Sequence, residues 1–471
     1  MSDSQPSQQR FDRSILEGSL SRAVWKLAWP TMLANVFGGV QGIVDQAMVG
    51  HYVGHTGNAA IGVSMQIFLL VIVFVASVFT GMGVLVARFA GAGDPDKVNR
   101  TVYQAFLAAV FMGLGLLAPV GYFAAPALLN MVNAAPEVQV EALPYIRIVF
   151  VFSIGMMVFF MMNGALRAAG DARTPLRLGV MMTTLNIVLN VILIGGLGPI
   201  PAFGTVGAAM GTAVASGAVG VVFVTLLFSD RLVVRFSRTM SWSPDWRVIR
   251  ELFRFGLPTG FQGIVMNISG LFLLRFIGSL EHSAEAQAAY AVTYTELFAL
   301  ITWTSVGLMG ATAAVAGQNL GAGRPDRSAR AAKVAATFGL GVAAVVGLMF
   351  IVFPRLLLAI FSLDDGIPYE LGSQLLRYLA VSGFFVTIAL TYTGGLQGTG
   401  DTRSPLYISI VSQFAVPIGM CMYFSLSQGL RPEDIWLAIV VGHITRATLS
   451  VLRFRQGKWR DIAVDIGPSP A

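Results

Sequence analysis

The carboxylate with the clearest chemical potential lies in the first apolar stretch of the sequence. Asp45 follows Asn35, Gly38 and Gly42 at steps of three or four residues, so a helix places all four on one face. An ionisable side chain at the centre of a bilayer costs at least about 2.5 to 3.5 kcal/mol, and such residues usually have a function. A carboxylate there can bind a proton or a sodium ion. The alternative is a carboxylate at a helix end that reaches water.

A second polar set lies in a later apolar stretch. Thr183, Asn186 and Asn190 follow one another at three and four residues, so their side chains point the same way from a helix. They can ligate an ion or support Asp45. We predict that Asp45, Asn186 and Asn190 are the ion-coupling residues. The same three residues form the one candidate metal site, which would bind Na⁺. No cofactor is expected beyond this coupling ion, H⁺ or Na⁺.

Glu296 is the other acid that we place inside an apolar stretch. A regular helix would put Thr293 one turn before it and Gly307 three turns after it on the same face. An acid without a matching base suits a cationic ligand or a coupling ion, although a hydrogen bond between helices is the alternative. The residues that we predict to contact a transported ligand are Glu296, Gln66, Thr183, Gln41 and Asn35.

His443 and Arg446 lie one turn apart in the last apolar stretch. A long basic side chain near the end of a membrane helix can extend its charge to the interface while its carbon chain stays in an apolar environment. We therefore expect a structural role for this pair, with Arg446 reaching the inner interface.

The composition excludes a water-soluble protein. Of the 471 residues, 55% are apolar and only 12% are charged, and the mean hydropathy is +0.72. Such a chain requires lipid as solvent, where the backbone must satisfy its own hydrogen bonds as helices. The net charge of +7 then indicates which loops face the cytoplasm, and no nucleic-acid partner is expected. The single cysteine, Cys421, excludes an internal disulfide.

Twelve windows are long and apolar enough to cross a membrane. They cover residues 27–47, 59–84, 103–124, 143–166, 175–196, 205–228, 252–276, 287–314, 332–354, 374–396, 405–427 and 434–454. Alternate loops are rich in Lys and Arg, so both termini are expected in the cytoplasm. The first 26 residues are polar and lack the apolar core of a removable signal peptide. We predict a multi-pass protein of the plasma membrane, the inner membrane of a bacterium.

The sequence repeats itself with one offset. GAGDPDK at 91–97 returns as GAGRPDR at 321–327, and GDARTPL at 170–176 returns as GDTRSPL at 400–406, both shifted by 230 residues (321 − 91 and 400 − 170). Each half is a six-helix unit, and because six is even the two halves share one orientation. The predicted fold is all-α, with twelve transmembrane helices in two parallel six-helix repeats, or lobes, around a central cavity. The offset also relates Glu296 to Gln66.

The helices and loops divide the chain into five parts. We predict a polar cytoplasmic tail (1–26), an N-lobe (27–228), a basic cytoplasmic linker (229–251), a C-lobe (252–455) and a cytoplasmic C-terminal tail (456–471). The arginines of the linker are expected at anionic headgroups. In the repeated loops, Gly170 and Gly400 are expected to end helices in a left-handed turn. Thr174 and Ser404, each followed by proline, are the expected N-caps.

The repeated loops and two further segments resemble the multidrug and toxic compound extrusion (MATE) family. These segments are LAWPTMLANVFGGVQGIVDQAMVG at 27–50 and TTLNIVLNVILIGG at 183–196. The resemblance implies twelve helices in two lobes and export of varied, often cationic compounds, driven by an inward sodium or proton gradient. It also implies an acid fifteen residues after a proline, as Asp45 follows Pro30. Pro30 is the predicted conformational residue, since it can kink the first helix.

The resemblance is incomplete at three positions. One branch of the family has Asp where this chain has Asn190. Another branch has a Glu in helix 7 and an Asp in helix 10, where alignment places Met266 and Val386. Asp45 is therefore left as the best coupling residue.

The function that these observations favour is secondary active multidrug efflux by alternating access, with H⁺ or Na⁺ as the antiported ion. The expected partners are small cationic or amphiphilic substrates and membrane lipids, and a monomer is expected. A lipid-linked oligosaccharide flippase of the same superfamily is the first alternative. An intramembrane enzyme is the second, but the spans contain no H-E-x-x-H, paired Asp or Ser-Lys arrangement, and the chain has no phosphate-binding G-x-x-x-x-G-K-[ST] loop. We do not expect an enzyme.

Overall fold

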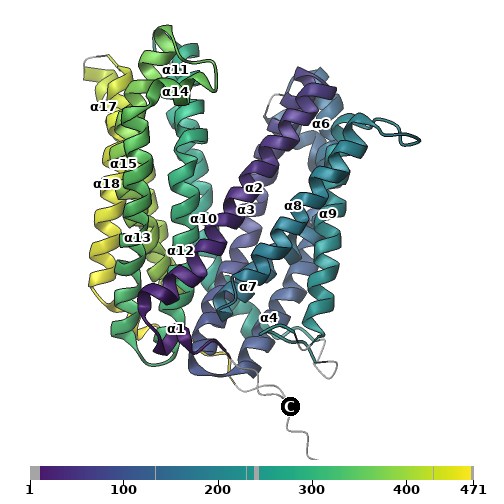
Figure 1. Ribbon diagram of the computed structural model, residues 1–471, viewed down its shortest axis with the longest axis vertical. Helices are drawn as coiled ribbons and strands as arrows, with labels where there is room; N and C mark the ends of the chain where they lie inside the picture. Colours follow the sequence, from purple (N-terminus) through teal and green to yellow (C-terminus); the bar gives the residue numbers. More distant parts are fainter. Residues whose placement is uncertain (1–10, 133, 230, 238–242, 428, 468–471) are drawn as a thin grey trace, which may run out of the picture. The chain divides into compact units, whose positions relative to one another are not determined.

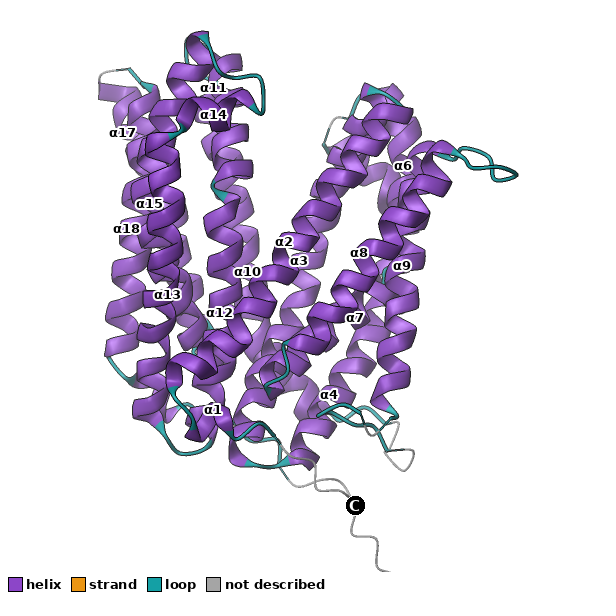
Figure 2. Ribbon diagram, in the orientation of Figure 1, coloured by secondary structure: helices purple, strands orange, loops and turns teal. Residues whose placement is uncertain are grey.

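The described part of the chain is helical in the computed structural model. It comprises residues 11–132, 134–229, 231–237, 243–427 and 429–467. These residues contain no β-strand, and one isolated bridge joins Leu197 and Ile200 (Figure 2). The all-α prediction is confirmed.

The first half of the chain supplies ten helical segments (Figure 1). They are α1 (Ser14–Glu17), α2 (Leu20–Tyr52), α3 (His55–Ala92), α4 (Pro95–Val110), η1 (Phe111–Leu117), α5 (Ala118–Met131), α6 (Pro136–Val151), α7 (Ile154–Ala169), α8 (Arg173–Gly195) and α9 (Gly204–Leu227).

The second half supplies the remaining segments. They are α10 (Trp246–Ile277), α11 (Ser283–Tyr290), η2 (Ala291–Leu297), α12 (Ala299–Gly321), α13 (Pro325–Val352), α14 (Pro354–Ala359), α15 (Gly366–Thr399), α16 (Arg403–Ser409), η3 (Ile410–Ala415), α17 (Val416–Ser427), α18 (Pro432–Arg455) and η4 (Lys458–Asp461).

The count of membrane-length helices agrees with the predicted spans. Eleven helices among the described residues are long and apolar enough to cross a membrane, and the pair α6 and α7, bent by 52° at a short break, brings the number to twelve. Three spans contain a π-helical turn, at η1, η2 and η3. Such turns shift the side chains that follow them around the helix axis and often occur at functional sites.

The chain packs as two compact units. Unit 1 consists of Leu33–Leu257 with short segments from both chain ends, and unit 2 consists of Ser14–Met32 and Pro258–Val464. In unit 1, α3 packs on α6 and α7, and α8 packs on α9. In unit 2, α15 lies against α12, α13 and α18 and is the most buried span. The unit boundaries fall inside α2 and α10, beside Pro30 and at Pro258.

The repeated GD loops form alike in both units. Gly170 and Gly400 end α7 and α15 with φ of 105° and 104°, a left-handed conformation that favours glycine. The expected N-caps, Thr174 and Ser404, are wrong. Their backbone N–H groups donate to Asp171 and Asp401 at 3.1 and 3.2 Å, because a carboxylate placed before the helix reaches these orphan donors first.

The repeated GAG loops hold the starts of the long helices. In unit 2, Arg324 donates to the carbonyl of Leu16 at 2.7 Å, and Arg327 donates to the carbonyls of Ile15 and Gly18. These carbonyls follow or end α1, where cations are favourable. In unit 1, the Arg100 guanidinium pairs with Asp245, directly before α10, with Nε donating to Oδ2 at 2.9 Å.

Candidate ion-binding site

The site forms where α2 and α8 meet in unit 1. Asn190 on α8 is fully buried, and its Nδ2 donates to Oδ1 of the partly buried Asp45 on α2 at 2.6 Å. A hydrogen bond to a carboxylate is roughly twice as strong as a neutral one. The predicted pairing of Asp45 with Asn190 is therefore present in the structure.

Asn186 lies one turn before Asn190 on α8 and is also fully buried. The amide orientation that satisfies its neighbours has Nδ2 donating to Asp45 Oδ1 at 2.9 Å and Oδ1 accepting from Thr212 Oγ1 at 3.2 Å. Asp45 thus accepts from two amides. Thr212 was not predicted, because it is one of three threonines in α9, a helix rich in glycine and alanine, and no sequence pattern distinguishes it from the other two.

One oxygen in this cluster has no partner. Asn190 Oδ1 is buried and accepts no hydrogen bond from the described residues. Buried acceptors are nearly always satisfied, so an orphan beside a carboxylate indicates a place for a cation or a proton donor. The set of carboxylate and amide oxygens is of the type that hard cations prefer, so these residues fit a coupling ion.

Gly211 on α9 makes room for this amide. A Cβ at this position would lie 2.1 Å from Asn190 Oδ1, far inside van der Waals contact. Glycine is therefore required for the Asn190 side chain to keep its position. The sequence offered no signal for this role, because the contact joins two helices and α9 contains several other glycines.

A second polar contact joins the same two helices. Thr183 Oγ1 donates to Gln41 Oε1 at 3.1 Å, so these two predicted residues come together. Asn35 is partly buried on α2. A Cβ at Gly38 or Gly42 would meet no atom within 4 Å, so this stripe of α2 borders open space.

Glu296 and Gln66 are exposed on their respective units. The predicted common face of Glu296, Thr293 and Gly307 is wrong: Thr293 and Gly307 are buried, and Thr293 donates to the carbonyl of Ala289 at 2.7 Å. The reason is the π-helical turn η2, which contains Thr293 and Glu296 and shifts the helical register.

Arg446 contradicts the expectation that its charge reaches the interface. Only 4% of its surface is exposed, and it forms no hydrogen bond or ion pair with the described residues. The ring of His443, one turn earlier, stacks on Phe298 at 6.0 Å with its Nδ1 unsatisfied. Because α18 packs against α15, the face of α18 that contains His443 and Arg446 lies in the interior of unit 2.

Membrane-length helices that hold a carboxylate among buried amides define a polytopic membrane transporter, and the comparisons with known proteins agree. The MatE family pattern matches residues 30–192 and again residues 258–422. The chain therefore belongs to the MatE family of multidrug and toxic compound extrusion proteins.

Curated relatives and solved structures cover nearly the whole chain. It is 29% identical to the probable multidrug resistance protein NorM of Thermotoga maritima over 446 residues, 93% of each chain. It is 26% identical to the multidrug resistance protein MdtK of Pectobacterium atrosepticum, over 92% of this chain and 95% of that one. A solved MATE transporter in an outward-facing conformation matches with a TM-score of 0.87 at 22% identity, covering 96% of this chain and 98% of that one.

Proposed function

We propose that this protein exports organic cations or amphiphilic drugs across the plasma membrane in exchange for inward-moving H⁺ or Na⁺. The observation that carries the proposal is the hydrogen bond of 2.6 Å from Asn190 to Asp45, which joins two helices of membrane-spanning length. The two relatives named as multidrug resistance proteins support the drug-export part. Both termini are proposed to be cytoplasmic, from the basic loops.

The coupling follows from the preference of the ion and the drug for different conformations of the protein. An ion that binds Asp45 removes its free negative charge and satisfies the orphan oxygen of Asn190, so it stabilises one conformation of unit 1. A cationic drug that prefers the other conformation is then released as the ion binds, and the coupling is reciprocal. Pro30 is proposed to let α2 bend between these states, because proline removes one hydrogen bond from the helix.

The remaining predicted residues are proposed to contact the drug. Gln41, Thr183 and Asn35 present amide and hydroxyl groups in unit 1, beside the open stripe at Gly38 and Gly42. Gln66 and Glu296 are exposed at repeat-related positions of the two units, and the Glu296 carboxylate suits a cation.

The test is gradient-driven uptake of a fluorescent organic cation into inverted membrane vesicles. A pH gradient without sodium and a sodium gradient at constant pH, imposed separately, identify the coupling ion. We expect Asp45→Asn to reduce uptake on the order of a hundredfold, because the ion then loses its charged ligand. Glu137→Gln removes an exposed acid of the same charge at the start of α6 and should leave uptake unchanged.

Two results would contradict the proposal. The first is full gradient-driven uptake by a correctly folded Asp45→Asn protein. The second is absence of uptake under both gradients in the unmodified protein together with movement of a lipid-linked sugar, which would favour the flippase.

A further inference from the structure

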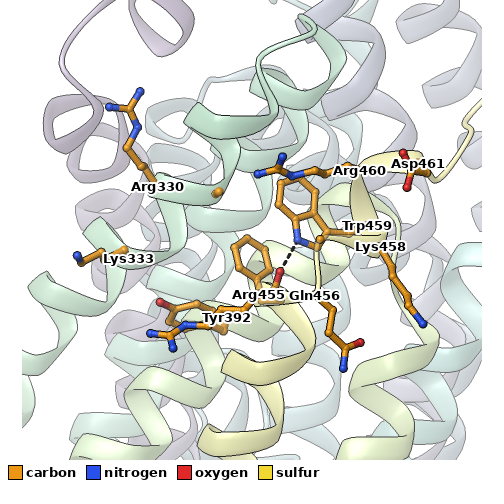
Figure 3. A pocket seen from close by; sticks show the side chains of 12 residues that line it. Arg330, Lys333, Tyr392, Arg455, Gln456, Lys458, Trp459, Arg460 and Asp461 are labelled. Carbon is orange, nitrogen blue, oxygen red and sulfur yellow. Dashed lines mark hydrogen bonds between the residues drawn. The ribbon is translucent and has the colours of Figure 1, made fainter.

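Unit 2 contains a pocket of about 610 Å³ where α13, α15, α18 and η4 meet (Figure 3). Its walls come from the first turns of α13, from Tyr392 near the end of α15, and from the segment 454–461 that ends α18 and forms η4. This pocket is separate from the carboxylate and amides of unit 1. Its volume is in the range that holds a small ligand.

The lining is strongly basic. It contains five cations and one acid, Asp461. The cations are Arg330, Lys333, Arg455, Lys458 and Arg460. The Arg460 side chain pairs with Asp326 at 3.0 Å, whereas the other four residues are exposed and their side chains form no ion pair or hydrogen bond with the described residues. Such a concentration of unpaired positive charge favours an anion.

The floor of the pocket is rigid and aromatic. Gly457, with φ of 73°, ends α18 in a left-handed turn that brings the chain back over the helix end. Trp459 then stacks on Phe454 with ring centroids 5.0 Å apart, and its Nε1 donates to the Phe454 carbonyl at 2.8 Å. The Arg460 guanidinium lies 5.4 Å from the Trp459 ring. Figure 3 shows Arg330 and Lys333 across the pocket from Trp459 and Arg460.

The repeat shows that these charges are not required by the fold. Arg330 corresponds to Arg100 at the offset of 230 residues (330 − 230). In unit 1, Arg100 is paired with Asp245 and donates to the Gly467 carbonyl at 3.1 Å. The same arginine is thus neutralised by protein groups in one half and left unpaired in the other.

The pocket lies where the apolar spans end. Lys333 is eight residues after Pro325, the first residue of α13, which corresponds to about 12 Å along the helix. The polar headgroup region occupies the outer several ångströms on each side of a bilayer. Basic pockets between helices on the cytoplasmic side recognise anionic headgroups. Arg binds a phosphodiester through two parallel hydrogen bonds and Lys binds it as a point charge.

We propose that this pocket binds the phosphate-bearing headgroup of an anionic phospholipid. Arg330, Lys333 and Arg455 contact the phosphate, and the aromatic floor of Tyr392 and Trp459 supports the glycerol and the start of the acyl chains.

The test measures which lipid stays bound to the intact purified protein. The protein is reconstituted in mixed vesicles of phosphatidylglycerol and phosphatidylcholine, and the bound lipids are identified by native mass spectrometry. We expect preferential retention of phosphatidylglycerol. The triple variant Arg330→Gln, Lys333→Gln, Arg455→Gln should retain at least about tenfold less, because each basic side chain near the headgroups attracts anionic lipid. The matched control Arg173→Gln, Arg177→Gln, Arg403→Gln removes the same charge from exposed positions near the starts of α8 and α16, and it should retain as much lipid as the unmodified protein.

A second measurement does not depend on the variants. A photoreactive phosphatidylglycerol should label the unmodified protein within residues 329–333 or 454–461, as mapped by peptide analysis. Equal loss of lipid in the pocket variant and the control, or labelling elsewhere, would overturn the proposal. Displacement of the lipid by millimolar inorganic phosphate would also overturn the lipid as ligand and indicate a soluble phosphate compound. Drug uptake is not part of either readout.

Discussion

The two repeats share a fold but differ in the chemistry at matching positions. Adding 230 to Asn186 and Asn190 gives Val416 and Met420, so the amides of unit 1 correspond to apolar residues in unit 2. Asp45 lies fifteen residues after Pro30, where the first family match begins, and the residue fifteen after Pro258, where the second begins, is the apolar Leu273. The helices and the GD loop turns are alike in the two repeats, whereas the carboxylate and the two amides of the candidate site correspond to apolar residues in unit 2.

The backbone differs at the same place. Helix α8 is regular from Arg173 to Gly195, which keeps Asn186 and Asn190 on one face. The corresponding helix of unit 2 contains the π-helical turn η3, so residues after Ala415 are rotated relative to those before Ile410. Gln413, which corresponds to Thr183, lies in that turn, whereas Val416 and Met420 lie after it, so the single face that Thr183, Asn186 and Asn190 share in α8 is interrupted in unit 2. The regularity of α8 is therefore part of the site.

Asp45 and Arg446, which lie inside membrane-length helices of the two units, have charges of opposite sign. Unit 1 holds Asp45 between two amides, whereas unit 2 buries Arg446 without a counter-ion among the described residues. The residue of unit 1 that corresponds to Arg446 is Ser216 (446 − 230), which donates to the Thr212 carbonyl at 2.8 Å.

The largest effect is expected when a residue of the ion site is replaced by its counterpart in the other repeat. Asn190→Met introduces the residue of unit 2 and should reduce ion-driven uptake by about tenfold to a hundredfold, because Asp45 loses one of its two amide donors and the ion loses the Asn190 oxygen. The reciprocal Met420→Asn should leave uptake unchanged. Both variants are checked by gel filtration and by uptake into inverted vesicles. An equal loss of uptake in the two variants would show that the two repeats do not differ at this site.

The next effect concerns the paired and unpaired arginines of the repeat. Burial raises the pKa of Asp245, but the hydrogen bonds and charge of Arg100 outweigh burial and lower it below its ordinary value of 3.8. The pair therefore stabilises the fold above pH 3.8, and this contribution is lost as pH falls through the lower pKa of the folded state. Asp245→Asn should lower the free energy of unfolding by about 2 kcal/mol at pH 7.

Thermal unfolding of the purified protein in detergent measures this difference, which should shrink below pH 3.8. Arg100→Gln should be destabilising at pH 7 like Asp245→Asn. Arg330→Gln, at the matching position of unit 2, should not change stability, because Arg330 forms no ion pair with the described residues. A loss of stability in Arg330→Gln equal to that in Arg100→Gln would contradict the distinction.

The smallest effect is expected at Gly211. A methyl group there would displace the Asn190 amide from Asp45, so Gly211→Ala should reduce uptake by about tenfold. Gly217→Ala on the same helix is the control, since its Cβ would meet no atom within 4 Å. Alanine also favours a helix over glycine by about 1 kcal/mol, so lost uptake would not reflect weaker helix formation. Normal uptake in Gly211→Ala would show that Asn190 does not need its observed position.

Three features could be predicted from the sequence: the number of spans, the repeat, and the helix end at the glycine of each GD loop. A segment that crosses lipid must satisfy its own backbone and requires about 20 apolar residues, so each span is a local property. A glycine at a helix end likewise acts locally, as Gly170 and Gly400 do. The helical spacing of Asn186 and Asn190 predicted a shared direction for the same reason.

Contacts between helices were decided by the tertiary structure. Asp45 and Asn190 are 145 residues apart, and their hydrogen bond depends on how α2 lies against α8. The roles of Thr212 and Gly211 depend on α9 meeting the same place. Hydropathy placed Arg446 near an interface, whereas packing of α18 buried it. Hydropathy records how apolar a segment is, but the direction that each face takes is set by the shapes of the neighbouring helices.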